Sequence, residues 1–462
     1  MQLHLIVLTT SQEISFLREK ILTLESIIIQ QAKIISALEH ELSKYKTKKN
    51  SGNSSLAPST DIGKPKRNQS LRDKSGKKPG GQLGHQGKTL EWNEKPDDII
   101  EHIPKLCEHC GESLIDKRKR FFDARQLIDI PPILTICTEH QIFEKQCKCG
   151  HYNYGTFPLG VQSKVQYGST IEALVAYLHT RQYMPFGRMQ EFFGCIMNLK
   201  ISTGGINHIL HRFTKKCLPI YASIKIRVEN ALIIGTDETG AAVNGKKGWF
   251  WTWQNKLFTF IEYSNNRGFN TIENLFKNGL AKAIIIHDCW AAHFKCVAKG
   301  HQVCLSHLIR EVNYFIDAYK SDWSDKFKSL IKEALELKKN LKSKDFKKPN
   351  VERDKLERRL TKLLKDQMIP PKHKEVITFQ NRIIKYRESI LLFLYHEYVP
   401  PDNNGSERAI RTIKVKQKVS GQFRSEKGAF AFAVIRSIID TAIKAGKDVF
   451  NELTIIADSG PE

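Results

Sequence analysis

A repeating pattern of apolar positions runs through the N-terminal part of the chain, between residues 14 and 45. The first (a) heptad position holds Ile14, Ile21, Ile28, Ile35 and Leu42, and the fourth (d) position holds Leu17, Leu24, Gln31, Leu38 and Tyr45. β-Branched residues at a with leucine at d favour a parallel two-stranded coil, and a polar seam residue such as Gln31 fixes its register. The pattern predicts a coiled-coil dimerisation helix within residues 1–46. The alternative is an amphipathic helix packed on its own chain.

The composition changes after this helix. Residues 47–92 are rich in Ser, Gly, Pro, Asn and Lys. From Lys44 to Lys88 there are twelve Lys or Arg and only two acids. We predict a basic flexible linker, which either neutralises phosphates with little sequence preference or serves as a solvated tether.

Two close cysteine pairs lie in residues 93–155. Cys107 and Cys110 form the first pair, and Cys147 and Cys149 form the second, each followed by glycine. Such pairs are typical of zinc knuckles, in which thiolate coordination holds a small fold together. We predict a zinc-binding domain with these four cysteines as ligands. The second pair is unusually close, so substitute ligands stay open: Cys137, His109, His140 and His151.

Helical patterns fill residues 156–228, and short apolar runs follow them. The helices predict a DNA-binding region of the helix-turn-helix kind, although helical pairs are common without DNA. Strands are predicted at 231–234, 249–253, 257–261 and 283–287, with an Asn244-Gly245 turn and a helix from about Thr271. Three adjacent strands, a helix and another strand are the layout of a ribonuclease-H-like α/β fold.

The α/β layout also predicts how the chain is divided from residue 229 onward. The α/β domain is predicted in two parts, 229–320 and 396–447. A basic helical insertion separates them at 321–395, with seventeen Lys or Arg and seven acids between Lys326 and Lys374. A C-terminal tail is predicted at 448–462. The fold class is therefore multidomain, with a coiled coil, a zinc-binding domain, a helical region and an α/β domain.

Two aspartates stand where predicted strands end. Asp237 follows the run 231–234, and Asp288 follows the run 283–287. Buried parallel-type strands deliver such side chains to the carboxyl edge of a sheet. Each aspartate alone is as well explained as the cap of a following helix.

A third acid lies on a short predicted helix after Pro401. Glu407, Arg411 and Lys414 share one face of it, at i, i+4 and i+7. Alone, Glu407 would close a capping box with Asn404. With Asp237 and Asp288, it completes three carboxylates, enough for two Mg²⁺ ions about 3.5–4 Å apart. The set predicts a two-metal phosphoryl-transfer site.

The net charge of the chain limits the kinds of molecule that it is expected to bind. Lys and Arg outnumber Asp and Glu by 73 to 49, giving a net charge of +24, which favours a polyanion and above all double-stranded DNA. We expect no membrane partner, because no uninterrupted apolar run approaches the roughly 18 residues of a span, and no signal peptide. Ten cysteines, some in close pairs, fit a metal site in a reducing cytosol better than a disulfide framework.

Several phrases of the chain are similar to those of the IS66-type insertion-sequence transposases, which use a DDE catalytic triad. They are the Asn53-Ser54-Ser55 and Gly80-Gly81-Gln82 linker phrases, the cysteine pairs, Asp237-Glu238-Thr239, His287-Asp288-Cys289-Trp290, Cys304-x-x-His307-x-x-Arg310 and Asp402-Asn403-Asn404-x-x-Glu407-Arg408. One departure is Ala57, which stands where the family often has proline.

The resemblance implies bacterial DNA transposition in the cytoplasm, with cleavage at the element ends and strand transfer into target DNA. The implied catalytic residues are Asp237, Asp288 and Glu407, which would bind magnesium or manganese. Glu238 and Asp402 are their nearest rivals as ligands. The implied DNA-binding residues are Lys414, Arg411, Arg408, Arg310 and His307, with core packing an equal alternative for His307. Companion proteins of the element are further expected partners.

Other functions remain open from the sequence. A zinc-containing dimeric DNA-binding regulator, a decayed transposase that only binds DNA, and a metal-dependent nuclease on the same fold all fit the coiled coil, the basic arm and the cysteine pairs. The three acids together with Lys414 favour the active recombinase.

Overall fold

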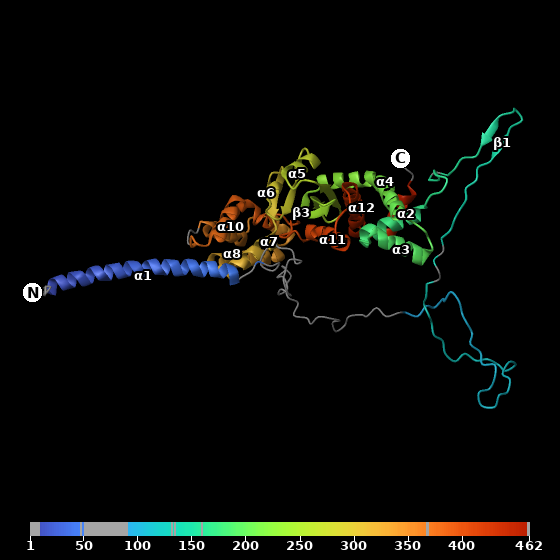
Figure 1. Cartoon of the computed structure of the whole chain (residues 1–462), viewed down its shortest axis with the longest axis horizontal. Coiled ribbons are helices and arrows are strands. Elements are labelled where there is room, and N and C mark those ends of the chain that lie inside the picture. Colours follow the sequence, from blue (N-terminus) through green and yellow to red (C-terminus); the bar gives the residue numbers. More distant parts are fainter. Residues whose placement is uncertain are drawn as a thin grey trace, which may run out of the picture.

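A five-stranded mixed sheet organises the larger part of the chain (Figure 1). The computed structural model describes residues 10–46, 49, 91–130, 133, 135–158, 160–365 and 369–459. The strands are β3 (Ile233–Val243), β4 (Lys246–Gln254), β5 (Thr259–Ser264), β6 (Leu280–His287) and β7 (Ala298–Val303). Their order in space is β5-β4-β3-β6-β7. β3, β4 and β5 pair antiparallel, whereas β6 runs parallel to both β3 and β7.

The hairpin between β3 and β4 confirms the predicted Asn244-Gly245 turn. Both residues have positive φ, 48° and 72°, as a two-residue hairpin turn of this kind requires. Along β4 the side chains alternate, so Trp251 and Trp253 enter one core cluster and Phe250 enters another. Both tryptophans are fully buried, which confirms that they belong to the core.

Helices cover the sheet on both faces. The core around Trp251 and Trp253 includes residues of α4 (Thr203–Glu229) and α12 (Glu426–Lys444), whereas Ile284 and Ile286 of β6 pack with α7 (Leu305–Tyr319). α12 also protects the edge strand β5. Its Ser437 and Thr441 hydroxyls accept hydrogen bonds from the Ile261 and Thr259 amides, at 2.9 and 3.2 Å. An open strand edge is thereby satisfied by side chains.

The predicted helical region consists of α2 (Ser169–Ala176), the π-helical turn η2 (Tyr177–Arg181), α3 (Phe186–Met197) and α4. It shares one hydrophobic core with the sheet. Lys416 of α11 (Asn404–Ser420) also joins this region to α11, because its buried Nζ donates to the carbonyls of His179, Tyr183 and Met184 at 3.4 to 3.5 Å. These helices are therefore part of the α/β body.

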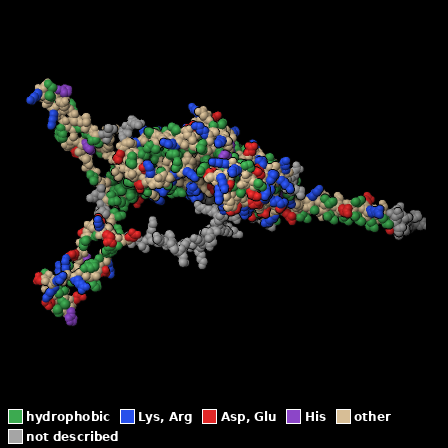
Figure 2. All heavy atoms as spheres, turned by 180° about the vertical axis from the view of Figure 1, so that it is seen from behind, with side chains coloured by type: hydrophobic (Ala, Val, Ile, Leu, Met, Phe, Trp, Pro, Cys, Tyr) green, Lys and Arg blue, Asp and Glu red, His purple; other side chains and the backbone are tan. Residues whose placement is uncertain are grey.

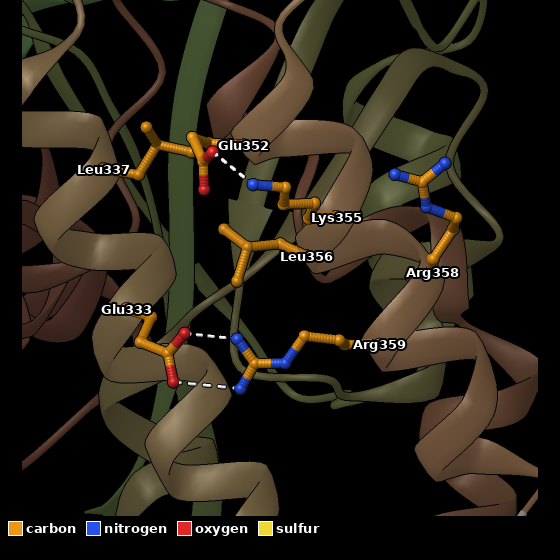
Figure 3. Close-up of a pocket in the computed structure, with 7 residues that line it drawn as sticks. All are labelled: Glu333, Leu337, Glu352, Lys355, Leu356, Arg358 and Arg359. Atoms are coloured by element: carbon orange, nitrogen blue, oxygen red, sulfur yellow. Dashed lines mark hydrogen bonds and ion pairs between the residues drawn. The ribbon is translucent and has the colours of Figure 1, made fainter.

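The predicted helical insertion is formed by α8 (Asp322–Asn340), α9 (Val351–Leu364) and α10 (Lys374–Lys385), with the 3₁₀ turns η3 (Ser343–Lys347), η4 (Arg387–Ser389) and η5 (Leu392–Leu394). It packs against α7 in a second core cluster. Figure 3 shows a pocket between α8 and α9, where both Arg359 guanidinium nitrogens pair with Glu333 and Lys355 pairs with Glu352 at 2.8 Å. Two of its cations are thus paired with acids, and Arg358, which also lines the pocket, leaves it with a net positive charge.

The segment predicted as a C-terminal tail instead contains the helix α13 (Val449–Asp458). The Asp448 side chain caps it by accepting the Asn451 amide at 2.7 Å. Leu453, Ile456 and Ala457 lie on one helical face and are buried in the main core. The apolar spacing of a helix was present in the sequence but was too short to stand out.

A long helix, α1 (Thr10–Lys46), projects from the body and touches it along its C-terminal half, where the Ser36 hydroxyl accepts a hydrogen bond from Lys372 at 2.6 Å (Figure 1). The seam residues with described side chains are exposed; Ile28 and Leu38 are 63% and 64% exposed. In Figure 2 apolar side chains follow this helix, while Lys and Arg are spread over the body. By length and composition, Glu13–Glu39 is also apolar enough to cross a membrane. The predicted basic linker lies almost wholly outside the described residues.

Candidate active site

Asp237 lies inside β3, where it pairs with Thr252 of β4. This corrects the expectation that it follows a strand end, because the antiparallel hairpin continues the strand to Val243. The parallel pairing with β6, however, stops at Gly235. Relative to β6, Asp237 therefore stands just beyond the carboxyl edge, which is the position expected for a ligand.

Asp288 directly follows β6, as predicted. Its Oδ1 accepts the Trp290 amide at 3.2 Å, and Cys289 between them has φ of +63°. A non-glycine residue in the left-handed region is uncommon and costs energy. The tight turn aims Asp288 back over the sheet edge and starts the short helix α6 (Ala291–Phe294).

Glu407 lies in the first turn of α11, and this helix docks directly on β3. Asn403, at the N-cap, donates from Nδ2 to the Thr236 carbonyl at 2.7 Å and accepts the Ser406 hydroxyl at 2.7 Å. The capping box of Glu407 with Asn404 is not formed; Asn403 holds the helix to the strand instead. The amide-to-carbonyl bond places the start of α11 beside Asp237.

The close approach of α11 requires glycine at 235. A Cβ built on Gly235 would lie 2.6 Å from Gln254 Nε2, 2.7 Å from Asn403 Oδ1 and 2.8 Å from Ser406 Oγ. Gly405 is similarly crowded by the Gln254 amide, at 2.5 Å. The sequence analysis missed both glycines and Asn403, because only the folded chain shows what they touch.

The other predicted acids act electrostatically on Asp237. Burial raises the pKa of the Asp237 carboxyl well above its usual range, and the charges of Asp288, Glu238 and Glu407 raise it further. A group of ligand atoms within 4.8 Å of one another joins Asp288 to Glu238 and His293, whereas the described residues form no such group of Asp237, Asp288 and Glu407. Glu238 is therefore a nearer neighbour of Asp288 than the sequence predicted. Carboxylate oxygens are the ligands that magnesium takes.

The raised pKa of Asp237 predicts how the free energy of unfolding changes with pH. The folded protein holds a proton on Asp237 to higher pH than the unfolded chain does, so this group favours folding at low pH and loses that effect as pH rises through the folded-state pKa. Asp237→Asn should therefore stabilise the metal-free protein at neutral pH by about 0.5–2 kcal/mol. Urea melts in chelator from about pH 4 to neutral would measure this.

Asp317→Asn is the matched control for this change, since Asp317 is an exposed acid of α7. It should alter stability by no more than about 0.5 kcal/mol. If the free energy of unfolding of wild type and of Asp237→Asn changed with pH in the same way, the raised pKa of Asp237 would be refuted.

Two predicted DNA-binding residues contact Glu407 instead. Arg310 Nη2 lies 3.3 Å from Glu407 Oε1, and His307 Nδ1 lies 3.6 Å from the same oxygen. Burial, with the Arg310 charge, lowers the His307 pKa to about 4, so its imidazole is neutral near pH 7. Arg310 therefore holds the carboxylate at Oε1, while His307 lies beside that oxygen without a hydrogen bond from Nδ1.

The remaining predicted DNA-binding residues lie along α11. Arg408 and Arg411 are exposed and available to a phosphate. Lys414 is half-buried, and its Nζ donates to the Gly240 carbonyl at 2.6 Å. Burial and Lys247 lower the Lys414 pKa. Lys414 thus anchors α11 to β3, and a phosphate would have to compete with that bond.

Glu238, a rival ligand, is held by two other side chains. Its Oε1 accepts from Arg267 at 2.8 Å, and its Oε2 faces His293 Nε2 at 3.0 Å. Burial raises the Glu238 pKa, but these two partners outweigh it and the net pKa is lowered. Arg267 in turn lies over the rings of Trp249 and Trp290, at 4.7 and 4.0 Å. Nothing in the sequence marked Arg267 or His293.

The other rival, Asp402, precedes α11. Its Oδ1 accepts the Asn404 amide at 3.1 Å. This local turn shapes the entry to the helix. Its position suits the support of α11 more directly than the binding of a metal.

The cysteine pairs each form a turn. Gly111 donates to the Cys107 carbonyl and Gly150 to the Cys147 carbonyl, both at 2.9 Å, and both glycines have positive φ. Hydrogen bonds from Cys110 and Cys149 lower the pKa values of Cys107 and Cys147. The second turn joins β1 (Glu144–Gln146) to β2 (Tyr152–Tyr154). Within the described residues the two pairs do not gather into one ligand group. Zinc binding stays a prediction.

A comparison with protein families supports the site. Residues 164–431 match the family model described as Transposase IS66 family, which is more than half of the chain. The match includes Asp237, Asp288 and Glu407 and begins after the cysteine pairs. A search of curated proteins gave no match.

Proposed function

Because the chain belongs to the IS66 transposase family, we propose that it cuts DNA at the ends of an insertion sequence and joins the freed 3′ ends to target DNA. The observation that supports this proposal is that Asp237, inside β3, carries a raised pKa to which Asp288 after β6 and Glu407 of α11 contribute. The family match supports a transposase and its use of DNA and divalent metal. The triad, the metal identity and the two chemical steps are our proposal.

The three carboxylates would hold two Mg²⁺ or Mn²⁺ ions. When bound, the ions supply charge stabilisation for the attacking and leaving oxygens of an in-line displacement. Glu407 Oε1 is already engaged by Arg310 and His307, so Oε2 is the atom we expect to face the ions. Arg408 and Arg411 would position the DNA backbone, since both are exposed on the same helix as Glu407.

The sheet topology supports the same proposal. The order β5-β4-β3-β6-β7, with three antiparallel strands followed by two parallel ones, is what we expect of a ribonuclease-H-like domain. In such open sheets, ligands bind beyond the carboxyl ends of the parallel strands. Asp288 stands at that edge, and the helical insertion returns the chain to it at Glu407.

The proposal is tested with double-stranded DNA that carries the element's own flanking ends. Wild-type protein should cleave these ends and join the 3′ strands to a plasmid in Mg²⁺ but not in chelator. Cleavage without joining would indicate a nuclease on this fold. Binding in the presence of the element's companion proteins, without cleavage, would indicate a regulator or a decayed transposase and would overturn the proposal.

We further propose that α1 pairs the protein with a second copy. Its exposed apolar seam has the heptad spacing of a coiled coil. Ile28→Lys should raise the dissociation constant of the dimer at least about a hundredfold, since each buried isoleucine contributes about 1.5–3 kcal/mol and each dimer buries two copies. Sedimentation equilibrium without DNA measures the mass.

Gln30→Lys is the control, because it adds the same charge to α1 outside the seam. It should leave the dimer intact. A monomeric wild type, or binding of the wild-type helix to lipid vesicles in place of self-association, would contradict the pairing.

The four paired cysteines are proposed as zinc ligands. Each turn already has its glycine in place and one thiol with a lowered pKa. Zinc would then supply the link that joins the two turns, as thiolate coordination does in small domains with little core.

A further inference from the structure

Beside the three-acid site lies a second group of ligand atoms with a different chemistry. The Cys304 sulfur, a His307 ring nitrogen and a Glu407 carboxylate oxygen all lie within 4.8 Å of one another. Cys304 is the N-cap of α7, His307 is in its first turn, and Glu407 comes from α11. α7 and α11, which are far apart in the sequence, thus bring three potential metal ligands together.

Backbone contacts hold these elements in register. The Asn403 amide donates to Cys304 Sγ at 3.2 Å, and the Leu305 amide donates to the Pro401 carbonyl at 2.9 Å. The same Asn403 side chain anchors α11 to β3. The ligand atoms therefore sit on a rigid support, as a metal site requires.

The donor set does not suit magnesium, which takes oxygen ligands. A thiolate, an imidazole and a carboxylate are the donors of zinc and similar cations. His307 Nδ1 is buried and makes no hydrogen bond, and it lies 3.6 Å from Glu407 Oε1. A buried ring nitrogen without a hydrogen-bond partner in the described residues is placed to bind a cation.

We propose that Cys304, His307 and Glu407 form a binding site for a soft divalent cation of the zinc class, separate from the magnesium site but sharing Glu407 with it. Binding replaces the thiol proton of Cys304 with the metal and releases that proton to solvent. The thiolate and the carboxylate balance the charge of the cation. Three protein ligands leave a fourth position for water or a phosphate oxygen.

The shared carboxylate has a functional consequence, which rests on the proposed function. A cation bound by the Glu407 carboxylate would compete with Arg310, whose Nη2 lies 3.3 Å from Oε1, and would draw the carboxylate toward Cys304. That movement would take Glu407 out of the geometry proposed for magnesium. Zinc at this site would therefore inhibit cleavage and joining.

Cobalt tests the site without any DNA. Full-length protein is freed of metal with a chelator and titrated with Co²⁺, while the cobalt–thiolate charge-transfer absorption in the near ultraviolet is recorded. Any cobalt held by the paired cysteines contributes equally in every variant, so wild type should show one equivalent more of this absorption than Cys304→Ser. The serine hydroxyl can still accept the Asn403 amide. His307→Gln should weaken cobalt binding by at least roughly tenfold. Loss of a residue that only supports a metal ligand already costs about 10- to 100-fold in affinity, and His307 is proposed as a ligand itself.

Cys296→Ser is the matched control, because Cys296 is also buried but belongs to no ligand group in the described part of the chain. It should keep the full absorption. Equal absorption in wild type and Cys304→Ser would mean that the cobalt is bound by the paired cysteines alone, and that result would overturn the proposal. So would the absence of absorption in wild type, or unchanged affinity in His307→Gln.

A second measurement separates this proposal from the proposed function. In the Mg²⁺-dependent joining assay, the zinc concentration that halves each protein's own activity should be at least about tenfold higher in His307→Gln than in wild type. An inactive wild type would count against the transposase and leave the cobalt result standing. Equal zinc sensitivity of the two proteins would refute the inhibitory role.

Discussion

Asp288→Asn is expected to abolish Mg²⁺-dependent cleavage and joining while leaving the binding of element ends intact. Asparagine has the same shape and can still accept the Trp290 amide, so the turn after β6 should survive. It removes one negative charge from the magnesium site. The rate should fall by about a hundredfold to a thousandfold or more, since a single stabilising group at a transition state contributes about 2.7–4 kcal/mol. Gel-based joining assays and binding assays on the same DNA measure both quantities.

Asp317→Asn is again the control for charge. It makes the same change of net charge at an exposed position of α7 and should join DNA at the wild-type rate. Asp237→Asn and Glu407→Gln should behave as Asp288→Asn does. Strand joining retained by Asp288→Asn would refute the assignment of the triad, and Glu238 and Asp402 would then be the acids to test.

Gly235→Ala is expected to damage both stability and catalysis. The new Cβ would overlap Gln254, Asn403 and Ser406, which together dock α11 on β3. Overpacking of this kind costs about 1–3 kcal/mol. Because Glu407 is on the same helix, a shift of about 1 Å would lower the rate by about a hundredfold. Denaturant melts and the joining assay report the two effects.

Gly194→Ala provides the comparison. Gly194 lies within α3, and a Cβ there would meet nothing within 4 Å. Alanine should leave activity unchanged and stabilise the helix by up to about 1 kcal/mol. A Gly235→Ala protein as stable and as active as Gly194→Ala would mean that α11 does not depend on this close approach.

Local patterns in the sequence predicted much of the fold. The Asn244-Gly245 turn, the strand before Asp288 and the helix of Glu407 all depend on neighbouring residues, so periodicity and turn chemistry were enough. Asp237 was placed at a strand end because the apolar run stops there. The strand continues because β4 pairs with it along its whole length, and pairing is a property of two segments.

The parts that the sequence did not reveal depend on distant contacts. Asn403 joins Thr236 across 167 positions, and Arg267 meets Glu238 across 29. Neither side chain has an unusual local context. The sequence proposes the acids, because their type and number suit the chemistry, but the groups that hold them in place become visible only when the elements are packed together.

The order of synthesis gives the helical insertion a further consequence. Glu407 comes 119 residues after Asp288, so at about 5–20 residues per second the ribosome needs about 6–24 s to add it. During that time a growing chain holds two of the three acids, and α12, which protects the β5 edge, has not been made. Closing so long a loop also slows folding. A stalled or truncated chain would therefore have the sheet and the cysteine pairs without the means to cut DNA.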